Sequence, residues 1–190
     1  MKAELKQLLD NRPKSFIEDA KRISSAVLIP LYKDRGIYHI VFIKRTDTVK
    51  THKGQISFPG GAREKTDNSL LDTALRESYE EIGLDINDVE ILGEMDDEIT
   101  TTSNFIVTPY IGAISWPYKF VKNTDEVDDI ICVPIPALLE KGCLRPDTET
   151  LDGEKVDSCA YHYRGQVIWG ATARILNKFL GIITASTGGE

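Results

Sequence analysis

Residues 61–84, GAREKTDNSLLDTALRESYEEIGL, hold the most informative pattern of the chain. Residues 68–82 are predicted to form a helix that ends at Gly83, because glycine readily adopts the left-handed conformation that terminates helices. On a helical projection the small and apolar side chains share one face, which is expected to be buried: Leu71, Ala74, Leu75, Ser78 and Ile82. A second sector, beside that face rather than opposite it, carries Glu77, Glu80 and Glu81.

The three glutamates stand where helix electrostatics disfavours them. Like charges three or four residues apart each cost about 0.2–0.5 kcal/mol, and the last turns of a helix favour cations. A solvated acidic face is one interpretation of this pattern. We favour a bound hard cation, because Mg²⁺ and Mn²⁺ take oxygen ligands and commonly share them with substrate phosphates.

The same stretch resembles the Nudix box, whose pattern is G-x5-E-x7-R-E-U-x-E-E-x-G-U, with U an aliphatic residue. Its second half matches at Arg76-Glu77, Glu80-Glu81 and Gly83-Leu84, although Ser78 fills an aliphatic position. One extra residue in the loop restores Gly61-x5-Asp67, with Asp in place of Glu. Asp67 is therefore left outside the set of candidate site residues.

The flanks are similar to the coenzyme A pyrophosphatase branch of that family. Upstream, FIKRTDTVKTHKGQISFPGG (residues 42–61) resembles the branch signature, with Lys50 where Arg is usual. Downstream, YHYRGQVIWGATARIL (residues 161–176) resembles its C-terminal block. Four groups near the FPGG run would suit the 3′-phosphate of coenzyme A, or would simply form a basic surface loop: Arg45, Lys50, His52 and Lys53. Phe58 completes the expected substrate-binding set.

The resemblance implies an enzyme that hydrolyses a nucleoside diphosphate derivative with the help of Mg²⁺ or Mn²⁺. Glu77 and Glu81 are the first choice as metal ligands, and Glu80 is either a third ligand or the base for the attacking water. The family pattern adds the backbone carbonyl of Gly61 as a ligand and gives Arg76 the role of orienting a carboxylate. Glu126 is a further candidate carboxylate.

The expected reaction cleaves coenzyme A or its thioesters into adenosine 3′,5′-bisphosphate and (acyl-)4′-phosphopantetheine. A Nudix pyrophosphatase of ADP-ribose or NADH is the alternative, and a non-catalytic nucleotide sensor is a third hypothesis. Trp169 is expected to pack in the core, with stacking on adenine as the alternative. The polar loop at residues 100–104 could carry function or be merely solvated.

Outside the helix, the chain mixes strands and helices without strict βαβ alternation. The predicted strands are residues 25–31, 38–44, 55–58, 89–93, 106–114, 130–133 and 161–169. One or two short helices, interrupted near Arg12-Pro13, are predicted within residues 3–22, and further helices at 136–141 and at 171–180. We therefore expect an α/β (α+β) fold in which a mixed, Nudix-like sheet is sandwiched between α-helices. Its predicted divisions are an N-terminal helical extension (1–23), a Nudix hydrolase domain (24–182) and a flexible tail (183–190).

Composition limits the partners. The chain has 190 residues with 30 Asp and Glu against 23 Lys and Arg, a net charge of −7, which argues against general nucleic-acid binding. The three cysteines suggest reduced thiols, and the longest apolar runs are too short to span a membrane. A cytoplasmic protein with a nucleotide-derived small-molecule substrate is expected, and a homodimer is compatible with the sequence.

Overall fold

The computed structural model describes residues 2–46, 54–151 and 153–187. Its helices are α1 (Lys2–Asn11), α2 (Leu70–Ile82), α3 (Ile135–Leu138) and α4 (Gly170–Thr187), with a 3₁₀ turn, η1, at Ile86–Asp88. The larger sheet contains β1 (Ile23–Asp34), β2 (Ile37–Arg45), β3 (Ile56–Ser57), β4 (Gly60–Ala62), β5 (Val89–Glu94), β6 (Glu98–Ile99), β7 (Phe105–Ile114) and β8 (Val127–Pro134). A second sheet contains β9 (Leu144–Leu151), β10 (Glu154–Tyr163) and β11 (Gln166–Ile168).

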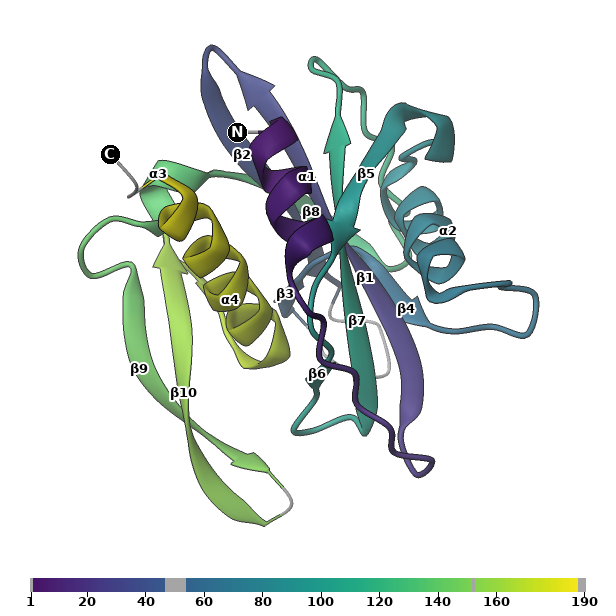
Figure 1. Cartoon of the computed structure of the whole chain (residues 1–190), viewed down its shortest axis with the longest axis vertical. Helices are drawn as coiled ribbons and strands as arrows, with labels where there is room; N and C mark the ends of the chain where they lie inside the picture. Colours follow the sequence, from purple (N-terminus) through teal and green to yellow (C-terminus); the bar gives the residue numbers. More distant parts are fainter. Residues whose placement is uncertain (1, 47–53, 152, 188–190) are drawn as a thin grey trace.

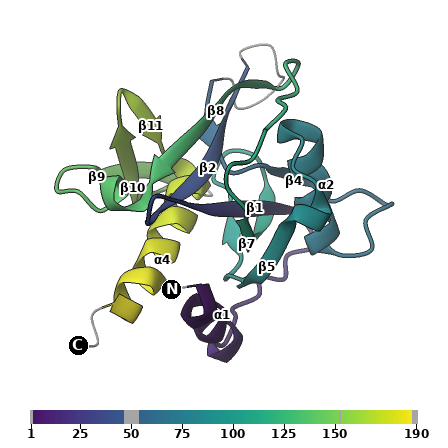
Figure 2. The same ribbon diagram turned by 90° about the horizontal axis from the view of Figure 1, so that it is seen from above.

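The larger sheet is mixed, as the sequence predicted. Its main path runs β3-β2-β1-β7-β5, in which β1 and β7 are parallel and β1 and β2 form an antiparallel hairpin. Helix α2 covers one face of this sheet, whereas α1 and α4 cover the other (Figures 1 and 2). The predicted sandwich of a mixed sheet between helices is confirmed.

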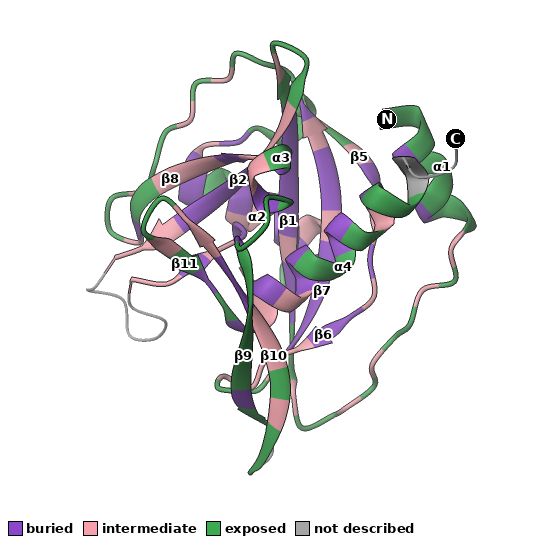
Figure 3. Ribbon diagram, turned by 90° about the vertical axis from the view of Figure 1, so that its left-hand side faces the viewer, coloured by how far each residue is buried: buried purple, intermediate pink, exposed green. Residues whose placement is uncertain are grey.

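Alternation along the central strands builds two separate apolar layers. On β2, Ile40 and Phe42 belong to the layer under α1 and α4, while Val41 and Ile43 belong to the layer under α2. All four side chains are fully buried, and the central strands of the sheet are mostly buried (Figure 3). Because successive side chains of a strand point to opposite faces, these strands need helices on both sides.

At the N-terminus the single helix α1 ends just before the interruption predicted at Arg12-Pro13, whereas the C-terminal end differs from the prediction. In the predicted N-terminal extension a single helix, α1, is followed by irregular chain, and its Leu5 and Leu9 are buried in the core. Helix α4 continues to Thr187, so the tail predicted from residue 183 is wrong over its first part. Ile183 explains the difference, because it is buried in the apolar layer under α1 and α4.

The second sheet is largely absent from the prediction. Its hairpin of β9 and β10 extends from the body of the protein with one exposed edge (Figures 1 and 3). The predicted strand at 161–169 is interrupted at Arg164 and Gly165, which both have positive φ and form the turn into β11. Within the described ranges, no helix has the length and apolar composition that a membrane crossing requires.

Candidate active site

Helix α2 carries the predicted carboxylates, and local signals fix both of its ends. Ser69 caps the N-terminus by accepting a hydrogen bond from the backbone of Asp72, whose side chain accepts one from Ser69 in return. Gly83 ends the helix in the left-handed conformation, at φ 66°. The capped helix therefore presents Glu77, Glu80 and Glu81 in its last two turns.

Glu81 is the most deeply buried of the three, with a side chain 1% exposed. Its Oε2 accepts a hydrogen bond of 2.9 Å from the backbone N–H of Gly60, and its Oε1 accepts one of 3.1 Å from Arg45 Nη1. Burial outweighs these contacts and raises the pKa of Glu81 to about 8. A buried anion with few partners is a group that a bound cation would stabilise.

Glu77 lies directly against Gly61. A Cβ atom at residue 61 would sit 2.4 Å from Glu77 Oε1, far inside van der Waals contact. Burial raises the pKa of Glu77, although the neighbouring Arg76 guanidinium opposes the shift. Only glycine at position 61 leaves this carboxylate in its place.

Arg76 organises the site from the other side of Glu77. Its Nη1 donates to Glu77 Oε1 at 2.9 Å and to Glu80 Oε2 at 3.0 Å. Its Nε and Nη2 donate to the buried carboxylate of Asp67, and Nη2 also reaches the carbonyl of Ala62. Hydrogen bonding to Arg76 holds the pKa of Asp67 well below its usual range. Asp67, left aside on sequence grounds, thus anchors the arginine that contacts two of the glutamates.

The three glutamates are not gathered into a preformed metal centre. Among the residues that the structure describes, no group of three His, Cys, Asp or Glu side chains is arranged to hold a metal ion. Glu77 and Glu80 turn toward Arg76, Glu81 turns toward Gly60 and Arg45, and the Glu80 side chain is 52% exposed. The adverse charges inferred from the helix are therefore partly offset by two arginines.

Of the remaining predicted site residues, some lie at the cluster or beside it, and the others fall outside the residues that the structure describes. Arg45 contacts Glu81, and its Nη2 lies 3.9 Å from Glu126 Oε2, so the extra carboxylate does adjoin the cluster. Phe58 is 2% exposed and stacks on Phe42, with ring centroids 4.9 Å apart. Lys50, His52 and Lys53 lie outside the described residues.

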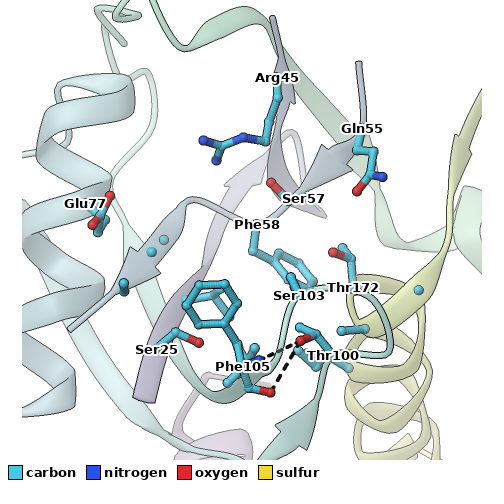
Figure 4. Close-up of a pocket in the computed structure, with 18 of the residues that line it drawn as sticks. Ser25, Arg45, Gln55, Ser57, Phe58, Glu77, Thr100, Ser103, Phe105 and Thr172 are labelled. Atoms are coloured by element: carbon cyan, nitrogen blue, oxygen red, sulfur yellow. Dashed lines mark hydrogen bonds between the residues drawn. The ribbon is translucent and has the colours of Figure 1, made fainter. Parts of the chain in front are cut away.

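A cavity of about 460 Å³ opens in front of the cluster. Its walls include Arg45, Phe58, Gly61, Glu77, Glu80 and Glu126. The opposite wall comes from the loop at residues 100–103 and from residues 169–172 at the start of α4 (Figure 4). Trp169 lines this wall and is 36% exposed, so the expectation that it packs in the core is wrong. The sequence left open whether the polar loop at residues 100–104 carries function or is merely solvated, and the structure places residues 100–103 at the cavity.

The site belongs to a fold with known relatives. A family model described as the NUDIX domain matches residues 22–151. The uncharacterized Nudix hydrolase NudL of Pectobacterium atrosepticum is 32% identical over 158 residues, which cover 81% of this chain and 79% of NudL. NudL of an Enterobacter species is 32% identical over 167 residues, covering 88% and 86%.

Solved structures show the same fold at low sequence identity. A MutT/nudix family protein from Enterococcus faecalis superposes with a TM-score of 0.57 at 15% identity, covering 99% of this chain and 80% of that chain. An Ap4A hydrolase from C. elegans gives a TM-score of 0.51 at 13% identity, with 60% and 81% covered.

Fold, carboxylate helix and sequence relatives together define a hydrolase of phosphoanhydride bonds. The chain belongs to the Nudix family. It is a Nudix hydrolase, a pyrophosphatase of nucleoside diphosphate derivatives, and enzymes of this family generally use divalent metal cations.

Proposed function

We propose that this enzyme hydrolyses the diphosphate of coenzyme A or acyl-coenzyme A, giving adenosine 3′,5′-bisphosphate and (acyl-)4′-phosphopantetheine. One observation carries the proposal. Both stretches that resemble the coenzyme A branch, within residues 42–61 and 161–176, line the same cavity as the carboxylates of α2 (Figure 4). Segments far apart in the sequence thus meet where substrate would lie.

The residues present fit a divalent cation. Glu77 and Glu81 offer carboxylate oxygens, which hard cations prefer as ligands. Residue 61 lies so close to Glu77 that only glycine, which has no side chain, fits there. Glu77, Glu81 and the Gly61 carbonyl would hold Mg²⁺ or Mn²⁺, with Glu80 as a third ligand or the base. When bound, the cation neutralises phosphate oxygens and makes a water more acidic.

Two arginines would position the catalytic carboxylates and the substrate phosphate. Arg76 positions Glu77 and Glu80 through its hydrogen bonds, while Asp67 fixes the arginine itself. Arg45 lines the cavity, and its buried Nε has no partner within the described ranges. That N–H is available to donate to a substrate phosphate.

The test compares substrates with the purified enzyme and Mg²⁺ or Mn²⁺. Coenzyme A, dephospho-coenzyme A, ADP-ribose and NADH are incubated separately, and the products are separated by chromatography. We expect rapid cleavage of coenzyme A to the two named products and slow cleavage of dephospho-coenzyme A, which lacks the 3′-phosphate. Fast cleavage of ADP-ribose or NADH while coenzyme A survives would assign the enzyme to another substrate. Binding without any hydrolysis would indicate a nucleotide sensor.

A further inference from the structure

The two ends of the cavity differ in chemistry. The charged side chains among the described lining residues are Arg45, Glu64, Arg76, Glu77, Glu80 and Glu126. Each of the four glutamates lies within 4.0 Å of one of the two arginines, so the charges form two groups, one around Arg45 and one around Arg76. The other end, which we call the distal end, is formed by Phe58, Ser103, Phe105, Thr172 and Ile175, with Ser57 at its border, beside Arg45 (Figure 4).

Figure 4 shows this separation directly. Glu77 lies on the side of α2, Ser103 and Thr172 lie across the cavity toward α4, and Phe105 lies between the two sides, near Ser25. The distal end thus offers hydroxyl groups set between aromatic and aliphatic side chains. Such a surface suits an uncharged group with hydrogen-bonding capacity, because a phosphate taken there would lose its water without gaining a cation.

Two hydroxyl groups at the distal end lack partners. The side-chain oxygens of Ser57 and Ser103 are buried and make no hydrogen bond within the described part of the chain. Buried polar atoms are nearly always satisfied, and an unsatisfied one costs stability unless a ligand or water completes it. A hydroxyl both donates and accepts, so the pair can bind either edge of an amide or another hydroxyl.

The backbone holds both serines facing the cavity. Ser57 follows Ile56 on β3, and because Ile56 is buried in the layer under α1 and α4, strand alternation turns Ser57 to the face of its β2 partner Ile43, where it borders the cavity. Ser103 stands in a loop closed at its base, where Thr100 and Phe105 exchange backbone and hydroxyl hydrogen bonds of 2.8 and 3.0 Å.

A buried polar network fastens the same loop to α4. Arg174 donates to the carbonyl of Ile99 at 2.6 Å and to Glu149 Oε1 at 2.5 Å. The other oxygen of Glu149 accepts a 2.8 Å hydrogen bond from Thr101, inside the loop. The wall that carries Ser103 is therefore preorganised before any substrate enters.

We propose that the distal end binds the uncharged arm of the diphosphate substrate, with Ser57 and Ser103 as its specificity-determining hydroxyls. The assignment rests on the proposed function. In coenzyme A the nucleoside half carries an additional phosphate, whereas the pantetheine half is uncharged and rich in amides. The pantetheine arm is then the half that lies between Ser57 and Ser103, and the 3′-phosphate lies toward the charged end.

The test uses the double variant Ser57→Ala/Ser103→Ala of the whole chain. We expect its KM for coenzyme A to rise about tenfold, with a much smaller change in kcat. Competitive inhibition by 4′-phosphopantetheine should weaken by a similar factor, while inhibition by adenosine 3′,5′-bisphosphate stays unchanged. Ser115→Ala, at an exposed serine outside the cavity, is the matched control.

Two further readouts keep the outcomes distinct. Because the removed hydroxyls have no partners, the variant should melt at the same temperature as the parent or higher, and a lower melting temperature would indicate a structural role instead. Calorimetric binding of 4′-phosphopantetheine to parent and variant needs no turnover. If coenzyme A is not cleaved but this binding needs both serines, the proposed function fails and the distal site stands. Cleavage of coenzyme A with an unchanged KM in the variant would overturn the distal site alone.

Discussion

The guanidinium of Arg76 holds the carboxylate of Asp67 through two parallel hydrogen bonds, from Nε to Oδ1 at 2.9 Å and from Nη2 to Oδ2 at 3.1 Å. Asp67 is buried and also accepts hydrogen bonds from Thr73 and from the backbone of Glu64. The pair ties the loop after β4 to the middle of α2. It also leaves Nη1 of Arg76 directed at Glu77 and Glu80.

Asp67→Asn should destabilise the fold in a pH-dependent way. The hydrogen bonds from Arg76 hold the pKa of Asp67 far below the value of about 3.9 in an unfolded chain. The ionised pair therefore contributes stability above that value, and the contribution is lost as the pH falls through and below it. Urea unfolding at pH 7 should show a loss of about 2–4 kcal/mol. The difference in unfolding free energy between the variant and the parent should narrow toward pH 3. A difference that stays constant with pH would contradict the ion pair of Asp67 with Arg76. Asp10→Asn, at an exposed carboxylate, serves as the control.

Gly61→Ala should impair catalysis more than stability. The new Cβ would collide with the carboxylate of Glu77, which must then move. A displacement of about 1 Å in a catalytic group can cost about 100-fold in rate, so we expect kcat/KM to fall on that scale. Gly181→Ala is the control, because nothing lies within 4 Å of its new methyl group. Equal activity of the two variants would remove Glu77 from the machinery.

Glu81→Gln should separate activity from folding. Loss of a carboxylate ligand removes several kcal/mol of transition-state stabilisation, so the rate should fall by about 100-fold or more. The chelated parent should melt higher when Mg²⁺ or Mn²⁺ is added, since a hundredfold excess over Kd contributes about 2.7 kcal/mol. That rise should shrink strongly in Glu81→Gln and persist in the exposed variant Glu140→Gln. An undiminished rise in Glu81→Gln would place the cation elsewhere.

Arg174→Leu should destabilise the wall of the cavity. Its loss leaves the buried carboxylates of Glu98 and Glu149 without their guanidinium. Burial alone would raise the pKa of Glu149, but the hydrogen bonds from Arg174, Ser158 and Thr101 lower it. We expect a loss of about 3–5 kcal/mol in denaturant unfolding at neutral pH. Arg145→Leu, at an exposed arginine, should change stability by far less, and similar losses in both would show that the network is not structural.

Local patterns account for the parts that could be predicted from the sequence. The bounds of α2 follow from its amphipathic periodicity and from Gly83, and the strands of the main sheet follow from their apolar runs. The hairpin of β9 and β10 escaped prediction because LRPDTETL is polar and Pro-containing, and the hairpin is mostly exposed, so no apolar alternation marks it. Exposed hairpins depend on their partner strand rather than on their own composition.

The site, too, contains residues that local sequence patterns predict and residues that only the tertiary structure brings together. Charge spacing on one helix identified Glu77, Glu80 and Glu81, and Arg76 stood beside them in the motif. The pairing of Asp67 with Arg76 depends on how a loop folds back on the helix, which no local pattern encodes. Likewise, the approach of residues 100–103 to the start of α4 is a product of tertiary packing, through Arg174 and Glu149.

The two apolar layers of the sheet have a consequence for how substrate preference can change. The carboxylates belong to α2 and its layer, whereas Phe58 and Ile175 at the distal end belong to the layer under α4. Substitutions in one layer are screened from the other by the sheet between them. Substitutions in α4 and in the loop at residues 100–103 can therefore change which substrate group is bound, while the carboxylates of α2 that serve hydrolysis stay unchanged.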